Sequence, residues 1–377
     1  MTRFECGPWT ITVTQDAFSL EDEWRALEEA PGTFITGFQR FDWIAPLYKH
    51  LYEDDEAIPL IVCFRNTQSG ALEILWPLAL EKRSVFGFLS TLSLRFADRR
   101  LSDYCVPIIA KDAPNDIPAS VILDALRQAA PQADLIHFDK WIGTETETFA
   151  QLNASQFCFP YHVHAYRLPL DLEQKEIAST HFFSRHRTKY RKLNRLAPVE
   201  ILSEEAGNIS PENLNLFFDL RLARFAKLGR DDAFANENIK NFYEDVALGY
   251  TAQATARLTI MKTGDNIASI AFGTLAEKSF YGLASAIDGD RFYKFSPALL
   301  LCIEDIKHCR EAGLRYYDFT LGDEGYKFHF KVEKRALSEI HYPITWRGQA
   351  SYQLRRLKQL VRKYPQLLAF TKKIRGK

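Results

Sequence analysis

The chain has 377 residues, 46% of them hydrophobic and 25% charged, which favours two globular domains over one. Its 48 basic and 48 acidic residues cancel, so the chain as a whole is not a general nucleic-acid binder and no DNA partner is expected. No apolar stretch approaches the ~20 residues that cross a bilayer, and the N-terminus does not resemble a secretory signal. Six cysteines without metal-type spacing predict free thiols in a reduced, cytoplasmic protein, and no metal site.

Alternating and helical hydrophobic patterns predict one order of elements in the first half of the chain. A strand is expected first, then two helices, of which the second carries aromatic residues at helical spacing. Two strands joined by a turn follow, and a helix and a strand close the unit. The expected ranges are 9–14, 22–30, 34–48, 59–64, 71–81, 118–130 and 134–139.

The second half repeats this order, which predicts a mixed α/β fold with mixed sheets and two similar modules. Ser210 and Pro211 begin its first long helix, because serine caps helices and proline suits the first helical position. The expected strands are 199–203, 256–262, 267–276, 280–287 and 314–319, and the expected helices are 211–229, 236–250 and 296–313. Duplication is one interpretation of the repeated order, and independent origin of the two halves stays open.

Residues 296–327 are the most informative stretch of the chain. Ser296 is expected to cap a helix with Pro297 in its first position, and Gly313 stands where that helix stops. A short strand follows, and then a loop dense in ionisable groups. A helix that starts after a strand leaves backbone N–H groups free, and phosphate is their natural ligand.

In this stretch the chain resembles the GNAT superfamily of acyl-CoA-dependent N-acyltransferases. It is most similar to the CelD/BcsL-like acetyltransferases of cellulose and exopolysaccharide biosynthesis, which are related to the Fem aminoacyltransferases. The shared pattern is a Ser-Pro helix start, a long apolar helix, a glycine, an aromatic-Asp-Phe strand and a Gly-x-Glu-x-Tyr-Lys loop, here with Gly325 as the residue between Glu324 and Tyr326. The resemblance implies two tandem GNAT-like modules, expected at 1–170 and 171–345, followed by a basic amphipathic tail at 346–377.

The resemblance also implies that the pantetheine of the donor enters between two strands that separate, here 280–287 and 314–319. The donor is expected to be acyl-CoA. Residues expected to bind it are Ala284 and Ser285 on the first strand, Arg291 and Lys294 in the following loop, and Ser296, Ala298 and Leu299 at the helix start.

N-acyl transfer needs a neutral amine, a donor for the oxyanion and a proton for the leaving thiolate. Asp318 and Glu324 are candidates for the general base or for orienting the amine. Tyr326 is a candidate proton donor, and Lys327 a candidate for stabilising negative charge or for binding a phosphate or carboxylate of the substrate. Asp288, at the end of the preceding strand, is a further candidate on the substrate side. Ordinary structural roles are the alternative for each.

One departure from the family leaves the donor open. Acetyl-CoA-dependent GNAT enzymes hold pyrophosphate in a glycine-rich loop, whereas residues 288–295 contain only one glycine. Arg291 and Lys294 are expected to substitute by charge. The alternative is a Fem-like enzyme that uses aminoacyl-tRNA, because those enzymes also lack the loop.

Two segments are strongly basic. Residues 181–195 carry six Lys or Arg and no acid, so Arg185 and Lys189 are candidates for binding phosphates of a cofactor or substrate, with a solvated helix face as the alternative. No acidic residue follows Glu339, so the tail is basic and amphipathic. It is expected either to dock on the protein or to contact an anionic membrane or a polysaccharide-synthesis assembly.

The leading hypothesis is an N-acyltransferase that moves an acyl group, such as acetyl, to an amine of a sugar, nucleotide-sugar or small molecule in polysaccharide assembly. A Fem-like transferase and a catalytically silent scaffold are the alternatives. The N-terminal module is expected to shape the acceptor cleft, with Trp76, Trp141 and Tyr161 either lining it or buried in the core. His162 and His164 alternate on a predicted strand, but no third metal ligand is evident.

Overall fold

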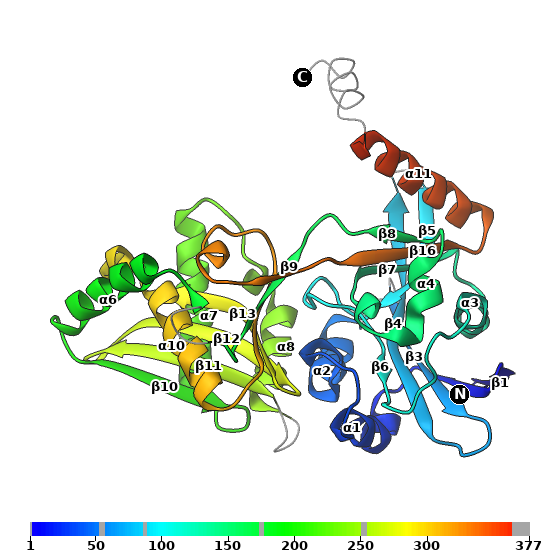
Figure 1. The fold of residues 1–377 in the computed structure, drawn as a ribbon, viewed down its shortest axis with the longest axis horizontal. Coiled ribbons are helices and arrows are strands. Elements are labelled where there is room, and N and C mark those ends of the chain that lie inside the picture. Colours follow the sequence, from blue (N-terminus) through cyan, green and yellow to red (C-terminus); the bar gives the residue numbers. More distant parts are fainter. Residues whose placement is uncertain (1, 53–56, 86–88, 173–176, 250–254, 364–377) are drawn as a thin grey trace.

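The computed structural model describes residues 2–52, 57–85, 89–172, 177–249 and 255–363. Two mixed sheets lie beside each other, each with helices packed on it (Figure 1). In the first sheet the order is β1-β2-β3-β4-β5-β7-β16-β8, with β6 paired to β4. Its strands are β1 (Thr2–Cys6), β2 (Trp9–Thr14), β3 (Ala57–Asn66), β4 (Leu72–Val85), β5 (Leu89–Phe96), β6 (Ile108–Ile109), β7 (Leu135–Trp141), β8 (Cys158–Pro160) and β16 (Ser338–Pro343).

The second sheet has the order β10-β11-β12-β13-β14-β9-β15. Its strands are β9 (Ala165–Pro169), β10 (Val199–Glu205), β11 (Ala256–Thr263), β12 (Asn266–Ala276), β13 (Ser279–Ile287), β14 (Tyr316–Leu321) and β15 (Glu333–Arg335). The four antiparallel strands β10–β13 lead to the parallel pair β13–β14, and β2–β5 lead in the same way to the parallel pair β5–β7. The repeated order predicted from the sequence is therefore a repeated topology, and the mixed α/β fold with two modules is confirmed.

The α-helices of the described residues are α1 (Glu21–Glu29), α2 (Phe41–Leu51), α3 (Ala119–Ala129), α4 (Ala150–Ala154), α6 (Thr180–Asn194), α7 (Pro211–Lys227), α8 (Glu237–Leu248), α9 (Gly289–Phe292), α10 (Pro297–Glu311) and α11 (Trp346–Lys363). Most agree with the predicted ranges because their caps and apolar faces are local. The Ser210 hydroxyl accepts a hydrogen bond from the Asn213 amide, as expected of a cap. The aromatic helix begins only at Phe41, because Phe34 pairs with Ile109 and residues 37–39 form a separate turn.

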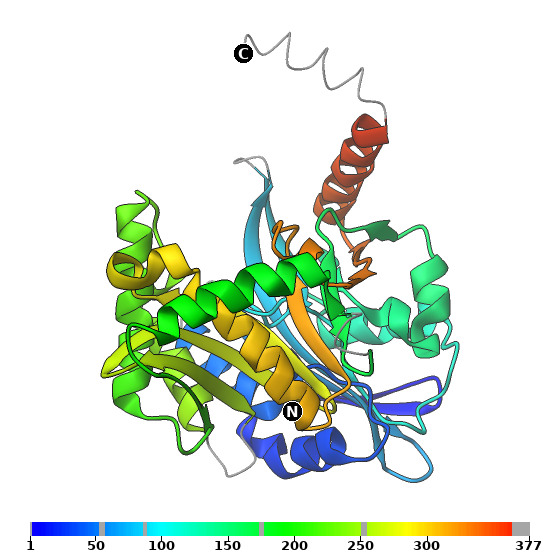
Figure 2. The same cartoon turned by 60° about the vertical axis from the view of Figure 1, so that its left-hand side comes forward.

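Helices cover both faces of the second sheet. The side chains of α7 and α8 share a core with Leu258, Ile260 and Phe272, whereas α10 packs on the opposite face over Met261 and Ala268. Figure 2 shows α6 and α10 on that outer face. A buried ion pair fixes α10 to β11, with Arg257 Nη2 2.7 Å from Asp305 Oδ1, and its partners are almost fully buried. This packing holds the N-terminus of α10 beside the edge of β13.

The two sheets exchange strands and so do not separate at residues 170 and 345. β9 precedes residue 170 but pairs with β14 of the second sheet, and β16 lies within 171–345 but pairs with β7 of the first. Aromatic contacts close the junction, including Trp43 against Phe242, whose ring centroids are 5.0 Å apart. A Cβ on Gly37 would come within 2.6 Å of Thr274 Cγ2, so a glycine is required for the close approach there. The modules form one packed body.

The first part of the basic tail docks on the protein. In α11, Ser351 and Tyr352 are buried, the Tyr352 hydroxyl donates to the Gln156 carbonyl at 3.2 Å, and Arg355 forms an ion pair with Glu339 of β16. Docking is therefore confirmed as far as this helix, while residues 364–377 of the predicted tail lie outside the described residues. None of the helices in the described ranges is long and apolar enough to cross a membrane.

Candidate active site

The strands β13 and β14 separate after a short stretch of pairing. Their register runs only from Ser279 opposite Tyr316 to Tyr281 opposite Asp318. The neighbouring pair β12–β13 is irregular at Phe272 and Gly273, and such bulges bend a strand and change the direction of its side chains. The rest of β13, from Gly282 onward, therefore faces an open gap. The two strands predicted to separate are the ones that do.

This gap is part of a cavity of about 710 Å³, which we call the donor cavity. Its apolar part is formed by side chains of β13, β14 and α10, including Phe280, Leu299, Cys302 and Phe319. Its polar part contains five basic side chains from four segments of the chain: Lys189, Arg221, Arg224, Lys294 and Lys327. An elongated ligand with an apolar arm and an anionic end matches this division.

The N-terminus of α10 differs from the predicted cap. Ser296 lies in the left-handed region with φ 56°, and its side chain does not cap the helix. Its Oγ instead accepts a hydrogen bond of 2.6 Å from Lys189 Nζ on α6. The first helical residue is Pro297, which has no N–H, and the Ala298 amide finds no acceptor among the described residues. The helix start thus offers one free amide and an adjacent ammonium to an anion.

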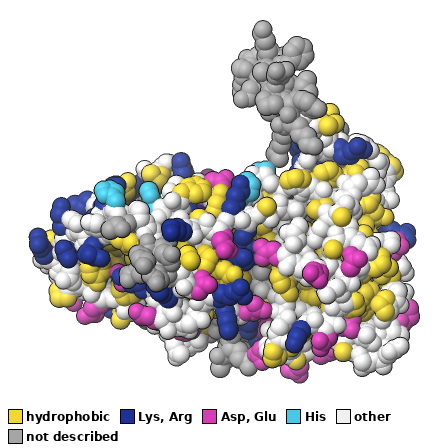
Figure 3. Space-filling model, in the orientation of Figure 1, with side chains coloured by type: hydrophobic (Ala, Val, Ile, Leu, Met, Phe, Trp, Pro, Cys, Tyr) yellow, Lys and Arg dark blue, Asp and Glu magenta, His cyan; other side chains and the backbone are white. Residues whose placement is uncertain are grey.

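Burial lowers the pKa of Lys189, and the nearby Arg185 lowers it further. An anion bound at this place would relieve both effects, because it favours the charged form of the lysine. Figure 3 shows Lys and Arg side chains gathered at the end of the molecule where α6 lies. The electrostatic field there is suited to phosphate groups.

Most residues predicted to bind the donor line the donor cavity, namely Ala284, Ser285, Lys294, Ser296, Ala298 and Leu299. Arg291 does not: it is exposed and contacts Asn266 and Asp288 instead. Asp288 is also outside the lining, because its carboxylate caps α9 by accepting from the amides of Asp290 and Arg291. On α6 the cavity is lined by Lys189 but not by Arg185, which is exposed to solvent.

Of the predicted catalytic residues, some line the donor cavity and one does not. Glu324, Tyr326 and Lys327 line the donor cavity. The buried Lys327 Nζ donates to the carbonyls of Leu321 and Gly322 and lies 2.8 Å from Glu324 Oε2, so its contacts are those of a residue that positions the loop. Burial raises the pKa of the Tyr326 hydroxyl, which therefore stays protonated at neutral pH and is able to donate a proton.

Asp318 lies outside the donor cavity, in contrast to its prediction as a base. Its carboxylate accepts from the Tyr104 hydroxyl at 2.7 Å, from Arg335 Nη1 at 2.6 Å and from the Thr320 amide at 2.8 Å. These three donors occupy lone pairs of the Asp318 carboxylate that would otherwise be able to accept a proton or a hydrogen bond from an amine. Asp318 instead joins the two modules and holds Thr320 in the left-handed region at φ 57°.

Replacing Arg335 by alanine is expected to destabilise the protein by roughly 3 to 5 kcal/mol, because it leaves the buried Asp318 carboxylate without its charged partner. Arg335 also binds Glu145 at 2.7 Å, so the change removes a second contact between modules. Equilibrium urea unfolding measures the loss. The exposed neighbour Lys334 supplies the control, and equal stability of the two variants would contradict a structural role for this network.

The residue missed by sequence reasoning is Asp103. It follows β5 in a turn of the N-terminal module, yet it lines the donor cavity of the other module. Burial raises the pKa of its carboxyl group, and hydrogen bonds from the Thr320 side chain and the Leu321 amide act in the opposite direction. A half-buried carboxylate with a raised pKa in a cavity is a candidate general base. No local sequence signal marks it.

Arg221 and Arg224 were also missed, although a signal existed. They fall within the apolar stripe of α7, four and seven residues after Phe217, where an arginine is unexpected. Arg221 Nη1 donates to the Ser285 carbonyl at 3.2 Å and Nη2 binds Asp232 at 2.8 Å. This arginine thus fixes the backbone of β13 at the gap.

A second cavity, of about 700 Å³, lies in the N-terminal module. Its walls come from β5, β7, β16 and α11, and it shares two lining residues with the donor cavity, Asp103 and Leu321. Of the three aromatic residues for which cleft lining and core burial were the alternatives, Tyr161 lines this cavity, whereas Trp76 and Trp141 are fully buried in the core. His162 also lines this cavity.

Three residues of the second cavity, His137, Glu339 and His341, form a group of metal-ligand type. Their surroundings disfavour a cation, because Arg95 Nη1 lies 2.6 Å from His137 Nδ1 and Arg355 pairs with Glu339. Since the arginine is always a donor, His137 Nδ1 is the acceptor and Nε2 carries the proton, which prevents Nε2 from ligating a metal. The residues do not fit a metal site.

Comparison with known proteins agrees with this geometry. Residues 181–328 match the acetyltransferase (GNAT) domain family. This segment is similar to GNAT-type acetyltransferase domains. It contains β13, the gap, α10 and β14, and it supports an acyltransferase activity for the chain. The sequence matches none of the curated proteins with which it was compared.

Solved structures show how far the fold extends beyond the GNAT domain. The crystal structure of FemX superposes with a TM-score of 0.58 at 14% identity, over 91% of this chain and 99% of that one. The C-terminal domain of a putative lysylphosphatidylglycerol synthetase from Agrobacterium fabrum gives 0.54 at 12% identity, over 92% and 97%. A conserved protein of unknown function from Bacteroides thetaiotaomicron gives 0.50 at 13% identity, over 89% and 100%. At such identities the likeness is one of fold.

Proposed function

We propose that the protein is an N-acyltransferase that takes its acyl group from acyl-CoA bound in the donor cavity. The observation that carries this proposal is the gap between β13 and β14, which ends at the basic N-terminus of α10. A thioester arm in the gap would place its amides beside the unpaired backbone of β13, and its phosphates beside Lys189, Lys294 and the Ala298 amide. The GNAT domain supports the same donor.

The phosphates are held here by charge more than by backbone. The segment that is a glycine-rich loop in related enzymes forms two short helical turns, α9 and residues 293–295, which use their own amides internally. Lysine and arginine side chains from α6, α7 and the α10 start surround the same place. Donor affinity should accordingly fall with rising salt, because exposed ionic contacts are screened.

The chemical step divides among residues of both modules. Asp103 accepts a proton from the acceptor ammonium, and the amine nitrogen then forms a bond to the thioester carbonyl carbon. Backbone amides of β13 stabilise the oxyanion. The carbon–sulfur bond breaks, Tyr326 protonates the thiolate, and the tyrosinate takes the remaining proton from the nitrogen. The products are an amide and free CoA, with the surplus proton left on Asp103.

Thermal unfolding with CoA, acetyl-CoA and longer acyl-CoAs tests the donor. The midpoint should rise with the logarithm of ligand excess over its dissociation constant. The order of affinity by chain length would identify the acyl group that the apolar part of the donor cavity accepts. The absence of a shift with every thioester, up to ~10 mM, would reject acyl-CoA as donor.

A second candidate is a Fem-like transferase that uses aminoacyl-tRNA. It is favoured by the exposed basic side chains of α6, which include Arg187, Arg191 and Lys192. Filter binding of aminoacylated tRNA at two salt concentrations distinguishes the candidates, because contacts to phosphates give a steep salt dependence. Tight, salt-sensitive binding without any response to CoA would replace the first proposal by this one.

The acceptor context is part of the proposal. The motif from Ser296 to Lys327 resembles the CelD/BcsL-like acetyltransferases, which favours an amine of a sugar, nucleotide-sugar or small molecule in polysaccharide assembly. Peripheral contact with a membrane or synthase through α11 belongs to the same proposal, because Trp346 and Leu357 are exposed on that helix. Specific CoA binding without turnover of any amine would point to a scaffold protein instead.

A further inference from the structure

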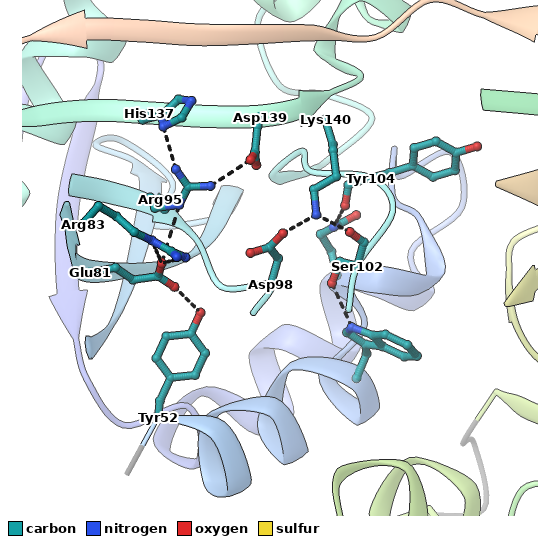
Figure 4. A network of polar contacts seen from close by, with 12 residues as sticks. Tyr52, Glu81, Arg83, Arg95, Asp98, Ser102, Tyr104, His137, Asp139 and Lys140 are labelled. Atoms are coloured by element: carbon teal, nitrogen blue, oxygen red, sulfur yellow. Dashed lines mark hydrogen bonds and ion pairs between the residues drawn. The ribbon is translucent and has the colours of Figure 1, made fainter. Parts of the chain in front are cut away.

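The second cavity has a connected network of polar side chains in its walls. Figure 4 shows Arg95 directed toward His137 and Asp139, and Lys140 directed toward Asp98 and the Ser102 backbone. These residues come from β5, β7 and the turn between β5 and Tyr104. The network is held on rigid strands, which gives the cavity a fixed shape and charge.

The charges of the lining side chains do not balance. Four carboxylates, Asp98, Asp103, Asp139 and Glu339, face six cationic side chains, Arg83, Arg95, Arg100, Lys140, Arg355 and Lys358. Glu81 is not part of the lining, but it forms an ion pair with Arg83 and lies 3.6 Å from Arg95, so an excess of one positive charge remains. A concave surface with this excess concentrates anions, because its low-dielectric walls focus the field.

Two histidines of the second cavity have polar atoms that could contact a bound ligand. Burial lowers the pKa of His137 and lowers that of His341 to about 4, so both are neutral near pH 7. The hydrogen bond from Arg95 leaves the proton of His137 on Nε2, as a donor. His341 is 4% exposed, and its Nδ1 has no hydrogen-bond partner among the described residues. A buried polar atom without a partner marks a place where a ligand can bind.

Asp103 sets the direction of a ligand in this cavity. It is one of the two residues that line both cavities, so an amine beside its carboxylate would stand next to the thioester. The cationic side chains of the second cavity, three of which form ion pairs with carboxylates of its wall, then lie beside another part of the same ligand.

We infer that the second cavity is the acceptor site, and that the acceptor is an amine carrying a phosphate or carboxylate group. The cationic lining holds the anionic group, and Asp103 receives the amine. The name acceptor site rests on the proposed acyl-transfer function. The binding of an anionic amine in the second cavity does not require that function.

Calorimetry with three matched amino sugars tests the inference: glucosamine, glucosamine 6-phosphate and glucosaminic acid. CoA is present throughout to occupy the donor cavity, so no turnover is required. At least one anionic sugar should bind roughly tenfold or more tightly than glucosamine. Comparison of glucosamine 6-phosphate with glucosaminic acid then shows whether the site prefers a phosphate or a carboxylate. Equal affinity for all three sugars would overturn the inference.

Charge-reversal variants locate the binding. Arg100→Glu changes an exposed lining residue in the turn after β5, and Lys358→Glu changes one on α11. Each variant should lower the ratio of the affinities for the anionic sugar and for glucosamine about tenfold. Lys111→Glu changes an exposed lysine of the same module outside both cavities, and it should leave the preference for the anionic sugar unchanged. An undiminished preference in both lining variants would contradict the inference. Failure of the thermal shift with CoA, with this binding retained, would reject the donor proposal alone.

Discussion

Replacing Asp103 by asparagine is expected to lower kcat for acyl transfer by about 10²- to 10⁴-fold, the usual contribution of a general base. Asparagine has nearly the same shape but cannot accept the proton of the ammonium. The thermal-shift midpoint with CoA should not change, because the phosphates bind at the other end of the donor cavity. Steady-state kinetics with saturating acyl-CoA and amine measures the loss.

The pH profile separates a base from a merely structural carboxylate. Because burial raises the pKa of Asp103, the acid limb of kcat/KM should lie above the ordinary aspartate value of 3.8, and activity should fall as pH drops through it. This limb should vanish in Asp103→Asn. The exposed Asp112→Asn is the matched control. An unchanged limb in Asp103→Asn would assign the base to another residue, with Glu324 next in position.

Removing Lys189 or Lys294 is expected to weaken acyl-CoA binding by about 10- to 100-fold each, with little change in kcat. A hydrogen bond between charged groups contributes roughly 1.5 to 3 kcal/mol, which corresponds to this range. Lys189 is positioned by its 2.6 Å hydrogen bond to Ser296 Oγ, beside the start of α10 in this cavity. Measurement of KM for acyl-CoA, together with calorimetry of CoA, gives both quantities.

A truncated donor provides the decisive control. Acetyl-pantetheine lacks the nucleotide and its phosphates, so Lys189→Ala should affect its kcat/KM hardly at all. Lys192→Ala removes an exposed lysine three residues further along α6, outside the donor cavity, and should leave acyl-CoA binding unchanged. If Lys189→Ala weakened both donors equally, the lysine would act on the structure of the gap and not on phosphates.

Local features of the sequence predicted the elements around the donor cavity. Helical periodicity, Pro297 and Gly313 define α10, and alternation with turn residues defines β11 to β13, because each depends on neighbours within a few residues. Lys294, Ser296 and Ala298 lie at the cavity for the same reason, since the start of the helix fixes their place. Even there, the left-handed Ser296 was not predictable, because Lys189 takes the hydroxyl that would have capped the helix.

The contacts between segments that are far apart in the sequence were decided only by the tertiary structure. The pairing of β9 with β14 and of β16 with β7 depends on which strand edges meet. Asp318 connects the two modules because its carboxylate accepts a hydrogen bond from Tyr104, 214 residues away in the sequence. Asp103 reaches the donor cavity through the same junction. The sequence by itself determined the helix and the strand beside the donor cavity and the place of Lys294 at the helix start, since these are local. The position of Asp103 between the two cavities and the second cavity itself arise from the packing of two modules, which no local pattern contains.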